Sequence, residues 1–165
     1  MRFANLLTTA LFGAVTAASP ASQQSGNSEA LQLVDFYIIT DTLHNASNLT
    51  TGADIQLLSF QFNSFVGSGS VPVSCAAAAA EGETSLRFNP AAYSCRSRFR
   101  HWGQYWFEVD RPNSQGVFGL TITHKDSSGV ETRGRASVPT KCHAGDADSL
   151  VCSQVGDVTI SLQRE

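Results

Sequence analysis

The sequence predicts an all-β domain, and three observations support that prediction. Apolar and polar residues alternate with period two in several short segments, which is typical of strands with one buried face. Gly, Asn, Ser and Pro separate these segments as turns. The chain has 13 Gly and 10 Phe with only 15% charged residues, and it has no long amphipathic helical pattern. Seven or more short strands of this kind predict a barrel or a sandwich.

The predicted strands follow one another along the chain. Residues 31–40, rich in β-branched and aromatic side chains, predict a buried strand. Residues 71–75 predict a short strand, and the five alanines that follow favour one helical turn ended by Gly82. The alternating residues expected to align on one face of their strands are Leu58, Phe60 and Phe62, then Phe118, Leu120 and Ile122, then Thr132, Ala136 and Val138, and finally Val158, Ile160 and Leu162.

Residues 1–18 have the features of a secretory signal peptide. Arg2 precedes an uncharged apolar run that ends in small residues near Ala18. The run is shorter than the roughly 20 apolar residues that cross a bilayer, and no later segment suggests a membrane span or a lipid anchor. We therefore expect a secreted, extracellular protein with a flexible leader over residues 19–30 and one domain over residues 31–165.

The charge balance limits the expected partners, and two sequons predict glycosylation. Fourteen acidic and 11 basic residues provide no global basic surface, so neither nucleic acid nor an anionic membrane is an expected partner. Two N-x-S/T sequons, at Asn45 and Asn48, lie in a polar, turn-rich segment. In a chain that enters the secretory route, we expect a glycan on at least one of them.

Four cysteines form an even set in an exported chain: Cys75, Cys95, Cys142 and Cys152. Disulfides are their expected state, although four cysteines allow three pairings and chain entropy selects none of them. An oxidised Cys142 can be neither a nucleophile nor a metal ligand. Next to it, His143, Asp146 and Asp148 supply too few oxygen ligands for a calcium loop. We expect no metal or other cofactor, and we interpret KCHAGDADSLVC as a structural clamp.

The segment from Cys95 to Asp110 contains the candidate partner-binding surface. In one uninterrupted strand, Phe99, His101, Tyr105, Phe107 and Val109 would face the core. The opposite, exposed face would carry Arg96, Arg98, Arg100, Trp102 and Trp106. Arg and Trp are enriched at interface hot spots and attract each other by cation–π contact. The alternatives are a solvated basic edge that discourages aggregation, and a bulge or turn at Gly103 that exchanges the faces.

An enzyme is the weaker hypothesis. Glu108 and Asp110 share a strand face, and EVDRPN is similar to the acidic motif of jelly-roll glycoside hydrolases. That motif has a further acidic residue where this chain has Asn113, so a two-carboxylate mechanism lacks its acid/base partner. His44, His101 and His124 have no Ser/Asp partners by motif. We therefore expect no catalytic residues.

Four motifs together resemble those of a known family. They are AAYSCR at residues 91–96, FEVDR, GLTIT, and ASVPTKCHAGDADSLVCSQVGDVTISL. From about Leu31 to Leu162 the chain resembles the Alternaria major-allergen-like family of small secreted fungal proteins. The resemblance implies a compact, mostly antiparallel β-barrel, the local disulfides Cys75–Cys95 and Cys142–Cys152, and no catalytic residues. It also implies allergen, effector or elicitor roles, with a plant defence protein or a small phenolic ligand as partner.

Two departures from the family pattern qualify that expectation. Members that form a disulfide-linked dimer use a cysteine near the mature N-terminus, and this chain has none there, which leaves a non-covalent oligomer as the alternative. The segment CRSRFRH after Cys95 matches no motif of the family. The leading hypothesis is a non-enzymatic protein that binds a plant partner and modulates or elicits defence. A phenolic or flavonoid carrier comes second, and a cell-wall carbohydrate binder or hydrolase third.

Overall fold

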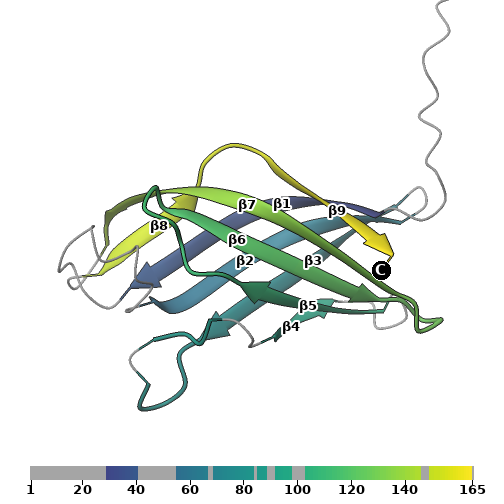
Figure 1. Cartoon of the computed structure of the whole chain (residues 1–165), viewed down its shortest axis with the longest axis horizontal. Helices are drawn as coiled ribbons and strands as arrows, with labels where there is room; N and C mark the ends of the chain where they lie inside the picture. Colours follow the sequence, from purple (N-terminus) through teal and green to yellow (C-terminus); the bar gives the residue numbers. More distant parts are fainter. Residues whose placement is uncertain are drawn as a thin grey trace, which may run out of the picture.

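A computed structural model describes residues 29–40, 55–66, 69–83, 85–88, 92–97, 103–145 and 149–164. Every regular element in these residues is a strand, as predicted, and none is a helix that could cross a bilayer. The strands, drawn in Figure 1, are β1 (Glu29–Thr40), β2 (Ile55–Val66), β3 (Gly69–Ala78), β4 (Tyr93–Ser97), β5 (Gln104–Val109), β6 (Val117–Lys125), β7 (Glu131–Ala144), β8 (Leu150–Gln154) and β9 (Val158–Arg164).

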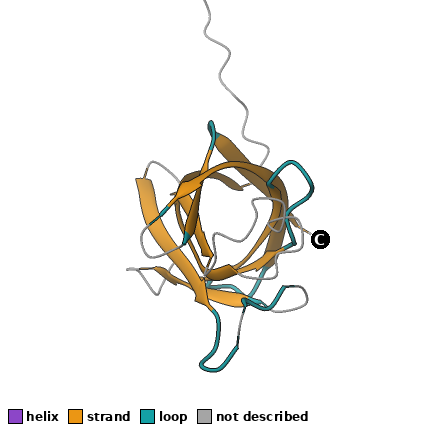
Figure 2. Ribbon diagram, turned by 90° about the vertical axis from the view of Figure 1, so that its left-hand side faces the viewer, coloured by secondary structure: helices purple, strands orange, loops and turns teal. Residues whose placement is uncertain are grey.

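The strands close into an antiparallel barrel, which Figure 2 shows end-on. Neighbours in sequence pair from β1 to β8, and β1 completes the circle by pairing with β2 on one side and with β8 and β9 on the other. β8 and β9 lie one after the other between β1 and β7. β8 pairs with one end of both strands, and β9 pairs with the opposite end of both. Of the two predicted architectures, the barrel is confirmed.

Apolar side chains fill the space that appears open between the ribbons of Figure 2. Ring contacts join several of the buried phenylalanines, with centroids 4.9 Å apart for Phe60 and Phe107 and 5.9 Å apart for Phe36 and Phe118. The predicted core sets of β2, β6 and β9 are all buried. In β7 only Val138 is buried, whereas Thr132 and Ala136 are half-buried. Burial of these strand faces supplies the main driving force for closure.

Three expectations about strand boundaries were wrong. β1 begins at Glu29, two residues before the expected start of the strand at Leu31. Ala76–Ala78 belong to β3 rather than to a helical turn, because they pair in register with Leu57–Ser59 of β2. The segment 95–110 is not one uninterrupted strand, since β4 ends at Ser97, β5 begins at Gln104, and the two run antiparallel.

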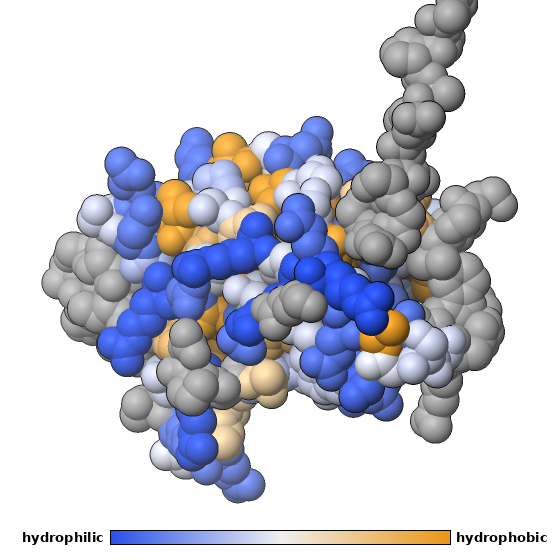
Figure 3. Space-filling model, turned by 45° about the vertical axis from the view of Figure 1, so that its right-hand side comes forward, coloured by the Kyte–Doolittle hydropathy of each residue, from blue (hydrophilic) through white to orange (hydrophobic). Residues whose placement is uncertain are grey.

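The outer surface is predominantly polar on the face in Figure 3. Hydrophilic side chains form a broad band there, and apolar atoms occur in small, separated patches. Cross-strand ion pairs also lie at the surface of the barrel, including Arg133 with Glu108 at 3.1 Å and Lys125 with Glu131 at 3.3 Å. Each such exposed pair contributes at most about 1 kcal/mol to stability.

Candidate functional site

The predicted Arg/Trp surface lies where β4 and β5 separate. Among the described residues, these strands pair only through Tyr93 with Phe107 and Ser94 with Trp106. Beyond these pairs they diverge around a cavity of about 530 Å³, which we call the β4–β5 fork. Its lining consists of Ser94, Cys95, Arg96, Ser97, Gly103, Gln104, Tyr105 and Trp106.

Different neighbours hold the two arms of the fork. β4 pairs with β3 at Val73 with Ser97 and at Ser74 with Arg96, and the Cys75–Cys95 disulfide joins directly opposite residues of these strands. β5 instead pairs with β6 along its whole length. β4 is therefore hydrogen-bonded to β3 and β5 to β6, and the cavity lies between the facing edges of β4 and β5.

Gly103 sets the start of the β5 arm. Its backbone has φ +104°, a left-handed conformation that residues with a Cβ rarely adopt. A Cβ at this position would lie 2.3 Å from the carbonyl oxygen of Lys125 and 2.6 Å from Nε2 of His124. A glycine is thus required both for the backbone conformation and for the close approach of β5 to the end of β6.

The fork brings together two of the five predicted partner-binding residues. Arg96 is exposed and Trp106 is half-buried, and both line the cavity. Arg98, Arg100 and Trp102 lie outside the described residues. The arrangement offers a guanidinium with five hydrogen-bond donors and an indole face in one concave wall, which suits an acceptor-rich or aromatic group. Of the predicted core set, Tyr105, Phe107 and Val109 are buried as expected, whereas Phe99 and His101 also lie outside the described residues.

The acidic residues Glu108 and Asp110 form ion pairs with β7. Glu108 contacts Arg133 at 3.1 Å, and Asp110 contacts Arg135 at 2.5 Å. Asn113 accepts hydrogen bonds from the backbone N–H groups of Gln115 and Val117, which shapes the turn between β5 and β6. All three side chains thus make contacts with other described residues.

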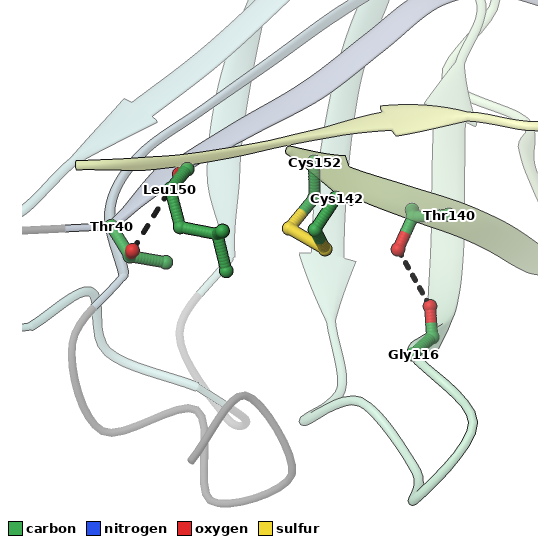
Figure 4. Close-up of a disulfide and its surroundings, with 6 residues drawn as sticks. All are labelled: Thr40, Gly116, Thr140, Cys142, Leu150 and Cys152. Carbon is green, nitrogen blue, oxygen red and sulfur yellow. Dashed lines mark hydrogen bonds between the residues drawn. A yellow bond between two sulfur atoms is a disulfide. The ribbon is translucent and has the colours of Figure 1, made fainter. Parts of the chain in front are cut away.

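The KCHAGDADSLVC stretch is a β7–β8 hairpin with a disulfide across it. Cys142 and Cys152 are opposite each other in the register, with Cα atoms 3.9 Å apart (Figure 4). At the same end of the barrel, the Thr140 hydroxyl donates to the Gly116 carbonyl at 2.7 Å. Asp146 and Asp148 lie outside the described residues, and the described residues contain no group of three or more side chains able to hold a metal ion.

A buried polar cluster of Glu29, Ser64, Tyr105 and His124 was missed by sequence reasoning. Glu29 Oε2 lies 2.6 Å from His124 Nδ1, and Oε1 accepts hydrogen bonds from the hydroxyls of Ser64 at 2.5 Å and Tyr105 at 2.8 Å. The Tyr105 ring stacks on His124 with centroids 4.0 Å apart. Ser64 contacts both the carboxylate and the Tyr105 hydroxyl (3.0 Å), so the four side chains form one connected cluster.

Burial and hydrogen bonding shift the pKa of Glu29 in opposite directions. Burial raises the pKa of the Glu29 carboxyl, but the hydrogen bonds from His124, Ser64 and Tyr105 outweigh it, and the net pKa is lower than usual. Burial raises the pKa of the Tyr105 phenol above its usual range. No sequence signal marked Glu29 as part of this cluster, because it lies in a polar segment that resembled a leader.

A family model for Alternaria alternata allergen 1 matches residues 33–152, which span most of the barrel. The chain belongs to this family. The family resemblance predicted from the motifs is therefore confirmed, and both disulfides have the local pairing that it implied.

Two solved structures share the fold of this Alternaria allergen 1 family member. The crystal structure of Alternaria alternata allergen Alt a 1 has 22% identity and a TM-score of 0.59, covering 82% of this chain and 88% of that chain. A second crystal structure of the Alternaria alternata major allergen has 20% identity and the same TM-score, covering 82% and 94%. No curated protein sequence matches the chain. At these identities the likeness shows the fold alone.

Within this family fold, the structure leaves some predicted sites unplaced. The sequon residues Asn45 and Asn48 lie outside the described residues, as do residues 1–18 of the expected signal peptide. The four cysteines, Arg96 and Trp106 are all described. Cys95 lies next to Arg96 in β4, lines the fork, and ties β4 to β3 through its disulfide.

Proposed function

We propose that this member of the Alternaria allergen 1 family is a secreted, non-enzymatic protein that binds a plant protein and thereby modulates or elicits defence. The fork is the proposed contact surface. The observation that carries the proposal is the convergence of Arg96 and Trp106 in one concave wall of the barrel. Arg and Trp are the residue types that most often dominate binding energy when a partner covers them.

The filled interior supports recognition on the outside of the barrel. Barrels that carry a small ligand enclose it within the strands, and here large apolar side chains of several strands occupy that volume in one continuous cluster. A ligand inside would have to displace them. The fork is formed instead by the outer wall, where a partner side chain can approach without disturbing the core.

Charge at the fork favours an acidic or acceptor-rich partner segment. Arg96 is exposed, and no described residue forms an ion pair with it. A carboxylate can receive two parallel hydrogen bonds from one guanidinium, and a planar or apolar neighbour in the partner can pack against Trp106. The proposed partner thus presents a carboxylate beside an apolar side chain.

Capture from plant apoplastic fluid tests the proposal. The immobilised wild type is expected to retain a specific protein, identified by mass spectrometry and then tested in purified form against Arg96→Ala and Trp106→Ala. Each substitution should weaken binding of the purified partner by about 30-fold, the loss typical of a hot-spot residue. Lys141→Ala, an exposed cation on β7, is the matched control and should bind like wild type. Unchanged affinity of both fork variants would reject the surface.

A small phenolic carrier remains the second candidate because of the size of the fork. Its volume of about 530 Å³ lies within the range of about 300–1,000 Å³ typical of small-molecule sites. A flavonoid bound there would quench Trp106 fluorescence in a saturable manner, and Trp106→Phe would abolish that part of the quenching. Saturable quenching without capture of a plant protein would favour the carrier. Sugar release from wall polysaccharides would instead overturn the non-enzymatic assignment.

A further inference from the structure

The buried polar cluster adjoins the fork through His124. Tyr105 belongs to both, because its hydroxyl donates to Glu29 Oε1 at 2.8 Å and its side of β5 also lines the fork. The His124 ring stacks on the Tyr105 ring, and the two residues are opposite each other in the register of β5 and β6. Nε2 of His124 is packed against Gly103, since a Cβ there would lie 2.6 Å from it. His124 thus contacts two of the residues that form the β5 arm of the fork.

Glu29 fixes the orientation of this imidazole ring. The last side-chain torsion of a histidine is only weakly restricted, so the hydrogen bonds of the ring nitrogens decide where they point. Oε2 of Glu29 lies 2.6 Å from Nδ1 of His124, and with Nδ1 held there, Nε2 is directed at Gly103. The side chains of Glu29 and His124 are only 14% and 9% exposed, so little water competes for this contact. Glu29 therefore acts on Gly103 through His124.

The negative charge of Glu29 gives the contact its strength. A hydrogen bond to an ionised carboxylate is about twice as strong as one between neutral groups. Burial raises the pKa of Glu29, but the hydrogen bonds from His124, Ser64 and Tyr105 bring it below its usual value of 4.5. The carboxylate is therefore ionised at neutral pH, and it loses its charge only as the pH falls through the acid range.

The strands on the other side of Glu29 place uncharged residues next to the cluster. β9 has Leu162 opposite Glu29, and β7 has Thr132 opposite His124. Arg164 is exposed at the end of β9, where its backbone pairs with Thr132. Neither Leu162 nor Thr132 ionises, so these two neighbours add no titration of their own to that of Glu29.

Asp126 is a second carboxylate close to the ring. It follows His124 by two residues and interacts with it electrostatically, and it accepts hydrogen bonds from the turn between β6 and β7. The hydrogen bond from the Ser128 hydroxyl is the main cause that holds the pKa of Asp126 below its usual value. A test of Glu29 must therefore separate two carboxylates that both titrate in acid.

We propose that Glu29 is a positioning residue for the fork: its ionised carboxylate holds the His124 ring against Gly103 and so places the β5 arm. A binding surface needs its contact residues held in place by neighbours behind them. β4 gives the start of this arm no support, because among the described residues its pairs with β5 lie further along that strand. The inference rests on the fork as the proposed contact surface, but the position of the β5 arm can be measured without any partner.

An acid titration of the isotope-labelled protein followed by NMR tests the proposal. The amide signals of Gly103 and Gln104 and the indole signal of Trp106 should shift with one midpoint, equal to that of the Glu29 carboxyl carbon. In Glu29→Gln this transition should be absent, and at neutral pH the same signals should be displaced toward their positions in acidified wild type. Fork signals that do not follow the Glu29 midpoint, or that titrate equally in Glu29→Gln, would overturn the proposal.

Two matched variants separate positioning from lost stability and from Asp126. Ser64→Ala removes another hydrogen bond to the same carboxylate but keeps its contact with Nδ1, so it should lower stability while the acid transition of Gly103 and Gln104 persists. Asp126→Asn removes the neighbouring charge and keeps an acceptor for the turn, and the transition should again persist. Its disappearance in Asp126→Asn would assign the shifts to Asp126 and contradict the proposal. Should Glu29→Gln fail to fold, the titrations of wild type and Asp126→Asn decide.

Affinity for the plant protein purified in the capture experiment distinguishes failure of this inference from failure of the proposed function. At neutral pH, Glu29→Gln should bind that protein about fivefold more weakly than wild type, and Ser64→Ala should bind it within about twofold of wild type. Wild-type affinity of a folded Glu29→Gln would show that Glu29 does not position a binding surface, although the fork still binds. Capture of no plant protein would reject the proposed function, and the NMR titration would then decide the role of Glu29 alone.

Discussion

Glu29 and His124 face each other inside the barrel, with 2.6 Å between the carboxylate Oε2 and the imidazole Nδ1. Their strands, β1 and β6, are not hydrogen-bonded neighbours, so the contact crosses the interior. The two side chains are only 14% and 9% exposed. Ser64 and Tyr105 bind the other carboxylate oxygen, so the first residue of β1 is tied to three other strands at once.

The buried polar cluster should make the free energy of unfolding depend on pH in the acid range. Hydrogen bonds outweigh burial and hold the pKa of Glu29 below its usual value of 4.5. A carboxyl with a lowered folded-state pKa contributes stability that is fully present above the unfolded pKa and is lost as the pH falls through the folded pKa. Glu29→Gln should lower the free energy of unfolding by about 1.5–3 kcal/mol at neutral pH, and this difference from wild type should shrink below about pH 4.

Urea unfolding at a series of pH values measures that difference. Glu131→Gln is the matched control, because Glu131 is an exposed carboxylate whose ion pair with Lys125 lies at the surface. Its unfolding free energy should stay within about 0.5 kcal/mol of wild type at every pH. A Glu29→Gln variant with the same parallel pH profile would show that the buried carboxylate contributes nothing to the acid limb.

Tyr105 should instead affect the free energy of unfolding at alkaline pH. Burial raises the pKa of its phenol, so the folded state keeps a proton that the unfolded state releases above about pH 10. Stability should fall as pH rises through this range, and Tyr105→Phe should reduce that fall. At neutral pH the substitution keeps the ring stacked on His124 and removes one buried hydroxyl, at a cost of about 1 kcal/mol. Absorbance titration of wild type and Tyr105→Phe at 295 nm checks this, because the wild type should show one further phenol that ionises only at higher pH, and identical curves would contradict the expectation.

The alternation of apolar and polar residues predicted much of the barrel, because it depends only on neighbouring residues within each strand. Phe60, Phe118 and Ile160 are buried because their strands have one apolar face, and that face is visible in the sequence. Non-local pairing decided the remainder. Ala76–Ala78 lack β propensity, yet β2 supplies a complete hydrogen-bonding partner along them and the strand continues. The same effect extends β7 through Cys142, where β8 supplies the pairing partner.

The candidate sites show a similar division. The cysteine count predicted two disulfides, and the family resemblance supplied their pairing. Arg96 and Trp106 were predicted to share a face of one strand, whereas they line one cavity from two antiparallel strands. Glu29 could not be found from sequence patterns, because its contacts depend on residues distant in sequence.

The Cys142–Cys152 disulfide should stabilise one part of the wall. It closes a separation of 10 residues, for which loop entropy gives about 3 kcal/mol. The Cys142→Ala/Cys152→Ala double variant should lose about that amount and should show faster amide hydrogen exchange in β8, because β8 has only short pairings with β1 and β7. Exchange in β6, which pairs along its length with β5 and β7, should change less. Uniform acceleration across the barrel would instead indicate a purely global effect.

Gly103 and Gly129 separate backbone conformation from packing, since both have positive φ, +104° and +87°. A Cβ at Gly129 would meet no atom within 4 Å, whereas one at Gly103 would lie 2.3 Å from the Lys125 carbonyl oxygen. Gly129→Ala should therefore cost only the left-handed conformation, about 1–2 kcal/mol. Gly103→Ala should cost about 3 kcal/mol or more, because the backbone of β6 or His124 must also move. Urea unfolding of both variants at neutral pH checks the difference, and equal losses would mean that β5 does not approach the end of β6 as closely as this geometry requires.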